Sequence, residues 1–242
     1  MSGEFLTLIC LFAAVILREG QCSLCYGVKE HLVPKRSAHG AWYLQYATPM
    51  KDGASFKTMN PSCGIYNTFD SACGCIGIFY TKGKKEEYTG TSFGYLKDEN
   101  LMFIRNFTTA TVDIDGRKIR KTSGTAFRRI TVPRNYKQCT VEFPELKAAG
   151  EDVQIRYYDL VASDDNKSYR VLISCDDGCF DSKDIRSVFD RNNPKIWIFH
   201  RSLKPTNKQL AAAFHFIRKY GFRKNRLRKV SHTKCVYPRI AS

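Results

Sequence analysis

Most of the chain consists of short runs rich in Tyr, Phe, Val, Ile and Thr, separated by turn-forming residues. Turn signals of the Asp-Gly, Gly-Lys and Asp-Asn kind recur at residues 51–53, 82–84, 97–100, 115–116 and 164–166. This spacing is typical of consecutive antiparallel hairpins. The sequence therefore predicts strands over residues 41–48, 76–81, 88–96, 101–107, 111–114 with 117–119, 126–132, 153–162, 168–174 and 195–201.

One amphipathic segment follows the last of these strands. Its apolar residues recur at the spacing of one helix face, between a cap at Thr206 or Asn207 and a stop at Gly221. One long helix after eight or nine strands indicates an all-β fold, and the many hairpins leave edges that closure of the sheet removes. The predicted fold is an eight-stranded up-and-down antiparallel barrel, with one C-terminal α-helix packed outside, in a single domain over residues 23–242.

Composition is consistent with this fold. The chain has 242 residues, of which 43% are hydrophobic and 26% charged, enough for a sizeable core. Disorder, collagen and coiled coil are excluded. The 39 Lys and Arg outnumber the 23 Asp and Glu, for a net charge of +16, which favours anionic partners or surfaces.

The N-terminus has the pattern of a secretory signal. Residues 5–17 are almost continuously apolar, whereas a membrane-spanning helix needs about 20 such residues. Polar residues follow, and Gly20-Gln21-Cys22 offers small residues at the positions that cleavage requires. We expect a signal peptide over residues 1–22 and an extracellular mature protein.

The cysteines agree with secretion. Once Cys10 and Cys22 are removed, an even number is left, which predicts disulfides rather than a metal site. The eight are Cys25, Cys63, Cys73, Cys75, Cys139, Cys175, Cys179 and Cys235. Asn106 and Asn166 begin glycosylation sequons, which suit a secreted surface.

The order of several motifs resembles the lipocalin family. Residues 40–43 (Gly-Ala-Trp-Tyr) are similar to the family's G-x-W at the first strand, and residues 196–201 (Ile-Trp-Ile-Phe-His-Arg) to its last-strand motif. Residues 158–164, Cys175, Pro205 before the helix and Cys235 continue the pattern of the apolipoprotein D, bilin-binding protein and crustacyanin branch. The resemblance covers most of residues 25–235. The long first connection, at 48–73, and the basic charge depart from the family pattern.

The resemblance implies that Gly40, Trp42 and Arg201 close the barrel, with the guanidinium over the indole. Such a contact stabilises a partly desolvated pair by about 1–2 kcal/mol. The branch also implies the disulfides Cys25–Cys175 and Cys75–Cys235. Cys139–Cys179 and Cys63–Cys73 are then the pairing we expect for the remaining cysteines, although sequence alone does not fix connectivity.

A barrel of this size holds side chains or one small molecule. Strand alternation from Trp42 and Arg201 places Tyr46 and Trp197 on the inner wall. The resemblance adds Tyr80 and Tyr158 as pocket aromatics, and alternation suggests Phe93, Tyr95, Phe103 and Phe127. Inward aromatics are also ordinary core residues. The implied function is to carry or sequester a small hydrophobic molecule, such as a pigment, bilin, fatty acid, steroid or amine.

Two alternatives come from other classes of protein. Catalysis has little support, because hydrolase, metalloprotease and phosphate-binding motifs are absent, the five histidines are scattered, and few lipocalins are enzymes; we expect no enzyme, cofactor or metal. The second alternative is a binder of extracellular polyanions, such as heparan sulfate or anionic lipid, through clusters of basic residues; a solvated surface is the equally plain explanation. Nucleic acid is not an expected partner of a secreted chain. The clusters are 218–229 and 117–134.

Overall fold

The computed structural model describes residues 38–49, 63–65, 68–81, 87–114, 117–124, 128–131, 140–142, 155–165, 167–174 and 195–239. The predicted signal peptide, Phe127, Asn166 and the cysteines at 25, 139, 175 and 179 lie outside these ranges. Within the described ranges, no helix has the length and hydropathy needed to cross a membrane.

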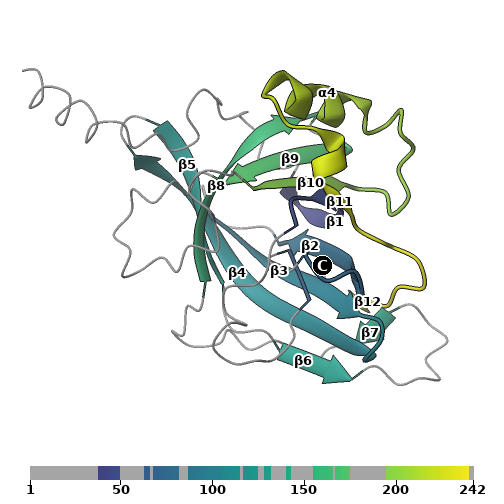
Figure 1. Ribbon diagram of the computed structural model, residues 1–242. Helices are drawn as coiled ribbons and strands as arrows, with labels where there is room; N and C mark the ends of the chain where they lie inside the picture. Colours follow the sequence, from purple (N-terminus) through teal and green to yellow (C-terminus); the bar gives the residue numbers. More distant parts are fainter. Residues whose placement is uncertain are drawn as a thin grey trace, which may run out of the picture.

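Eight strands form the wall of an antiparallel barrel. Each pairs with the next along the chain, and the ring closes where the last strand pairs with the first. Figure 1 shows the resulting curl of the sheet. The wall consists of β1 (Gly40–Ala47), β2 (Cys73–Tyr80), β3 (Glu87–Leu96), β4 (Leu101–Ile114), β5 (Arg117–Gly124) continued by β6 (Arg128–Thr131), β8 (Ile155–Asp164), β9 (Tyr169–Ser174) and β10 (Ile196–His200). The predicted eight-stranded antiparallel barrel is confirmed.

Three short strands were not predicted. β11 (Arg228–Lys229) pairs with the end of β1, while β12 (Tyr237–Arg239) pairs in parallel with β7 (Thr140–Glu142). The predicted break between residues 107 and 111 was wrong, because β4 runs without interruption through three consecutive Thr and Ala residues that pair with both β3 and β5. β-branched threonines favour such a continuous strand.

The helix α4 (Ala211–Lys219) lies outside the barrel, over β9 and β10 in Figure 1. Thr206 and Gln209 bond reciprocally in the turn before it, where the Gln209 N–H donates to Thr206 Oγ1 (3.3 Å) and the Thr206 N–H to Gln209 Oε1 (2.8 Å). Gly221 ends the helix with a φ of +81°, as predicted. Ala213 and Ile217 are the buried face.

Buried side chains form three clusters. The inner cluster lies inside the barrel and includes Trp42, Phe103 and Trp197. The outer helix cluster joins β8–β10 to α4 through Val171, Ile173 and Ile217. The third lies outside β2–β4, under the C-terminal segment, and includes Cys235. The helix covers the outer face of β8–β10, and the C-terminal segment covers the outer face of β2–β4. These strands therefore carry apolar side chains on both faces.

Candidate functional site: the barrel interior

The closed end of the barrel is built around Trp42. Its indole N–H donates to the carbonyl oxygen of Ala38 (2.8 Å), and Arg201 holds its guanidinium carbon 3.8 Å from the indole centroid. Arg201 also donates from Nη1 to the Ala41 carbonyl oxygen (2.9 Å). Gly40, with a φ of +94°, leaves room for this arginine, since an added Cβ would lie 3.0 Å from its Nη1. The closure predicted for these residues agrees with this geometry.

A second arginine completes the base. The guanidinium carbon of Arg170 lies 4.4 Å from the centroid of Trp42, and Arg170 Nε pairs with Asp164 Oδ2 (2.5 Å). The two residues are opposite each other on β9 and β8, and both side chains are almost fully buried. Burial lowers the pKa of Arg201 to about 10, the charge of Arg170 acts in the same direction, and Asp164 opposes both. Arg201 therefore remains charged at neutral pH.

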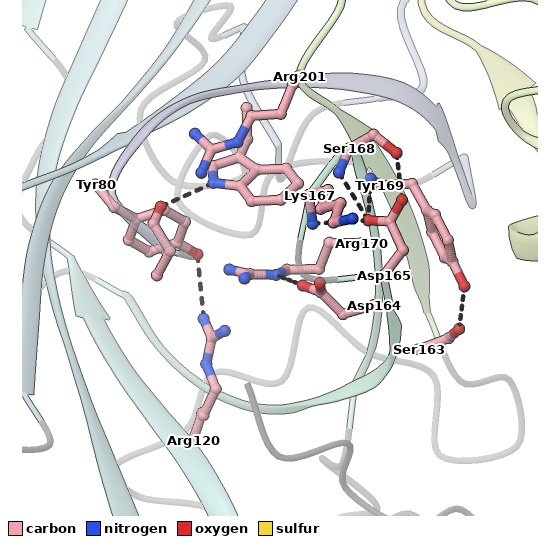
Figure 2. Close-up of polar contacts among 12 residues, drawn as sticks. Tyr80, Arg120, Ser163, Asp164, Asp165, Lys167, Ser168, Tyr169, Arg170 and Arg201 are labelled. Carbon is pink, nitrogen blue, oxygen red and sulfur yellow. Dashed lines mark hydrogen bonds and ion pairs between the residues drawn. The ribbon is translucent and has the colours of Figure 1, made fainter. Parts of the chain in front are cut away.

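Tyr80 belongs to this end as well. It pairs with Gly40 in the sheet, and its hydroxyl accepts a hydrogen bond from Arg120 Nη2 (3.2 Å). Figure 2 shows Tyr80 and Arg120 beside the Arg170–Asp164 pair, with Arg201 on the other side. Phe107 contacts the Tyr80 ring edge-on, at 5.5 Å between centroids. Tyr80 is an interior aromatic, as predicted, but it lies at the closed end of the barrel.

The opposite end of the interior is apolar. Trp197 is buried, and its indole N–H donates to the carbonyl oxygen of Ile65 (3.0 Å). Ile65 belongs to the long β1–β2 connection, which the Cys63–Cys73 disulfide ties to the start of β2. Phe103 joins the same inner cluster. Trp197 and Phe103 therefore lie in the barrel interior, and their contact with a ligand stays a prediction.

Buried polar groups on the inner wall were missed by the sequence reasoning. Arg105 is 1% exposed and Thr109 2% exposed. They alternate along β4 with Phe103 and Phe107, so the period-two pattern from Phe103 was the signal that could have found them. Thr109 bonds the hydroxyl of Thr122 across to β5 (2.6 Å).

Tyr46 does not face the interior, so that prediction was wrong. A bulge between Leu44 and Tyr46 reverses the alternation of β1, because the extra residue, Gln45, is skipped in the pairing with β10. Gln45 instead donates to the carbonyl oxygen of Ser202 (3.2 Å). Tyr46 packs edge-on against Phe214 of α4, at 5.1 Å between ring centroids.

Phe93 and Tyr95 also lie outside the barrel, contrary to prediction. Phe93 contacts Tyr237 of the C-terminal segment, at 6.0 Å between centroids. Tyr95 donates its hydroxyl to Asn100 Oδ1 (2.6 Å). Both are buried because the Cys75–Cys235 disulfide holds the C-terminal segment over this face. A strand whose outer face is covered in this way carries buried aromatics on that face too, so residue type alone does not show which aromatics face the interior.

The other predicted residues have mixed outcomes. The disulfides Cys63–Cys73 and Cys75–Cys235 are both present. Asn106 lies on β4, where its Oδ1 accepts from the Thr91 hydroxyl (3.1 Å). Tyr158 of β8 pairs with Lys121 of β5 through the backbone, but its side chain is not among those that the structure describes, so its place in the pocket stays a prediction. Among the described residues, His, Cys, Asp and Glu do not gather in threes that could hold a metal ion.

No protein-family model matches the sequence, and no curated protein matches it. Solved structures do match the fold. Lobster apocrustacyanin A1 is 15% identical, with coverage of 83% of this chain and 81% of that one and a TM-score of 0.50. The tryptamine complex of the amine binding protein of Rhodnius prolixus is 12% identical, with 87% coverage of both chains and a TM-score of 0.52.

A structure described as a biogenic amine-binding protein is 13% identical, covers 88% of this chain and 91% of its own, and has a TM-score of 0.53. Identities this low carry information about the fold alone. That information agrees with the ring of eight strands and the helix outside it. The resemblance seen in the sequence is thus confirmed in three dimensions: the chain has the lipocalin fold.

Proposed function

We propose that this protein is a secreted carrier or sequestering protein, without enzymatic activity, that binds one small and mainly apolar molecule inside the barrel. The observation that carries the proposal is the polarity of the inner wall. Its closed end is sealed by the Trp42, Arg201 and Arg170 stack, while Phe103, Leu172 and Trp197 line the opposite part. A barrel of eight strands has room for a small ligand above such a base.

The energetics of burial support this proposal. Transfer of about 300 Å² of apolar ligand surface out of water contributes on the order of 7 kcal/mol before entropy losses, which corresponds to micromolar or tighter binding. The buried Arg105 and the Arg120–Tyr80 hydrogen bond supply polar groups on the same wall. A ligand that is mostly hydrocarbon or conjugated ring with one or two polar groups matches this lining.

The similar structures give examples of ligands, not the identity of this one. The Rhodnius prolixus structure is a tryptamine complex, which is an example of an amine ligand. Pigments, bilins, fatty acids and steroids also stay within the proposal. Secretion is supported by the apolar N-terminal run and by the Cys63–Cys73 and Cys75–Cys235 disulfides, which persist in oxidising compartments. Glycosylation at Asn106 and Asn166 remains part of the proposal.

The test has two arms. Mass spectrometry of an organic extract of the protein from its native source should identify a small molecule at close to one equivalent. Separately, titration with Nile red, a neutral lipophilic dye, should show saturable binding at a single site. Trp197→Leu, inside the barrel, should raise the dye Kd about tenfold or more, whereas Tyr46→Leu, on the outer face of the same barrel, should leave it within about twofold.

Thermal unfolding of both variants ensures that the comparison is made between folded proteins. Equal effects of Trp197→Leu and Tyr46→Leu on the dye Kd would contradict an interior site. An empty extract together with no saturable dye binding would contradict the carrier function itself.

A further inference from the structure

The positive charge of this protein is concentrated at its C-terminus. Residues 195–242 contain 13 Lys and Arg and no Asp or Glu, whereas residues 1–194 contain 26 basic and 23 acidic residues. The final fifth of the chain therefore accounts for all but three of the 16 net charges. A solubilising surface does not require such segregation, because mixed charges spread over the surface serve that purpose.

Six of these cations lie within residues 218–229, and we call them the basic strip. They follow the end of α4, the 3-10 helix η1 (Lys224–Arg226) and β11, and all six side chains are exposed. Within the described ranges, no carboxylate forms an ion pair with any of them. The strip consists of Arg218, Lys219, Arg223, Lys224, Arg226 and Lys229.

Two other arginines of the predicted basic clusters form hydrogen bonds within the fold instead. Arg228 is half-buried and donates to the backbone carbonyls of Thr68, Ser71 and Cys73, at 2.5–3.1 Å. Arg120 lies inside the barrel against Tyr80. Because Arg120 is buried, the predicted 117–134 cluster is not purely a surface feature, and the basic strip is the better candidate for recognition.

The strip borders a groove with a volume of about 330 Å³ beside α4. Phe214 and Phe222 provide apolar walls, and Arg218, Arg223 and Lys224 provide cations at the same place. The Lys224 ammonium lies 4.4 Å from the centroid of Phe214, which keeps it at the groove. Guanidinium groups pair bidentately with tetrahedral oxyanions, and apolar walls suit the C–H faces of sugar rings.

We propose that the basic strip and this groove bind a sulfated glycan chain of the extracellular matrix or cell surface. A linear polyanion can follow cations arranged along three consecutive elements. An anionic membrane is the less suitable occupant, because peripheral membrane binding uses exposed apolar side chains, and Phe214, Phe222 and Leu227 are partly buried against the outer helix cluster. This site is separate from the barrel interior.

Heparin provides the test. The full-length mature protein is titrated with heparin at several salt concentrations, for the wild type and for Arg223→Gln/Lys224→Gln/Arg226→Gln. A matched control, Lys167→Gln/Lys208→Gln/Lys234→Gln, removes three exposed cations elsewhere. The strip variant should raise the heparin Kd about tenfold. It should also reduce the slope of log Kd against log salt concentration by about three, because three cations that contact the polyanion are removed. The control should change the Kd by less than about twofold.

Three results would overturn the glycan site. Equal losses in both triple variants would mean that net charge alone attracts heparin. Undiminished binding of desulfated heparin would exclude sulfate recognition. Binding of phosphatidylserine vesicles at least as tight as heparin, per unit charge, would assign the strip to a membrane. Nile red binding, measured in parallel on both variants, reports on the barrel interior and should stay unchanged whichever result the glycan titration gives.

Discussion

Trp42, near the start of the first strand, lies 3.8 Å beneath the guanidinium carbon of Arg201, just beyond the last strand. The contact adds a side-chain link beside the backbone pairing of β1 with β10. Because Arg201 also bonds the Ala41 carbonyl, one side chain connects the two ends of the barrel wall in two ways.

Arg201→Ala should therefore destabilise the fold by about 2–3 kcal/mol, through loss of the cation–π contact and of the hydrogen bond to Ala41. Lys204→Ala, three residues later and exposed, is the matched control and should change stability by less than about 0.5 kcal/mol. Urea unfolding followed by tryptophan fluorescence measures both. Similar midpoints for the two variants would mean that the Trp42–Arg201 contact does not hold the barrel closed.

The two described disulfides should differ in their contribution to stability. Cys75 and Cys235 are 160 residues apart in sequence, and Cys63 and Cys73 are 10 apart. In the chain-entropy model these separations correspond to about 5 and about 3 kcal/mol. Replacement of each pair by alanines, with unfolding measured for both, should show the larger loss for Cys75/Cys235. Hydrogen exchange should also rise in residues 228–239 of that variant alone.

Asp165 should stabilise the β8–β9 turn in a pH-dependent way. Burial raises its pKa, but hydrogen bonds from the Ser168 hydroxyl and from the backbone N–H groups of Tyr169, Ser168 and Lys167 lower it to about 2. The folded-state pKa is below the unfolded value of about 3.9, so the stabilisation is present above pH 4 and is lost as pH falls towards 2.

The measurement is the difference in unfolding free energy between wild type and Asp165→Ala. Because the side chain is exposed and screened by water, we expect about 1 kcal/mol at pH 7, shrinking towards pH 2. Glu99→Ala, at another exposed turn carboxylate, serves as the control. A difference that stays constant from pH 7 to pH 2 would show that the Asp165 charge is not responsible.

His232 should make the attachment of the C-terminal segment weaken in acid. Its Nε2 bonds the Leu44 carbonyl oxygen (2.8 Å) and its Nδ1 bonds the Tyr237 hydroxyl (2.8 Å). The neutral imidazole satisfies both, with Nε2–H as donor and Nδ1 as acceptor. Burial lowers the pKa of His232, and nearby Lys97 acts in the same direction, while the bond to Leu44 opposes them. Stability is therefore complete above about pH 6.5 and falls as pH drops below that value.

NMR titration of the His232 ring protons should give a pKa below that of the same residue in urea-unfolded protein. Hydrogen exchange of residues 228–239 should accelerate from pH 7 to pH 5, after correction for intrinsic rates, and His232→Gln should lose this dependence. A folded-state pKa at or above the unfolded one would contradict the neutral network.

The sequence predicted the barrel because its signals are local and repeated. Turn residues and β-rich runs located the strands, and the order of motifs identified the Trp42–Arg201 closure and the Cys75–Cys235 disulfide. Cys63–Cys73 was only the pairing expected for the remaining cysteines, because sequence does not fix connectivity. The side-chain directions were harder to predict. The bulge at Gln45 reversed the phase of β1, so Tyr46 was assigned to the wrong face.

Covered outer faces caused the other errors. Phe93 and Tyr95 are buried outside the barrel by a segment more than 130 residues away, an arrangement that no local pattern reveals. Buried arginines cause the opposite error, because residue type predicts that an arginine is exposed. Arg170 is 2% exposed and appears as a surface cation in sequence, until Asp164 and Trp42 are seen beside it.

The most direct test of the central claim, that a ligand binds within the barrel, uses the alternation of β9. Leu172 faces the interior, whereas its neighbours Val171 and Ile173 face the outer helix cluster. In a methyl-labelled sample saturated with Nile red, isotope-filtered NMR should show nuclear Overhauser contacts from the dye to the methyl groups of Leu172 and Val161. Contacts to Val171 and Ile173 without contacts to Leu172 would place the dye outside the barrel and contradict the account.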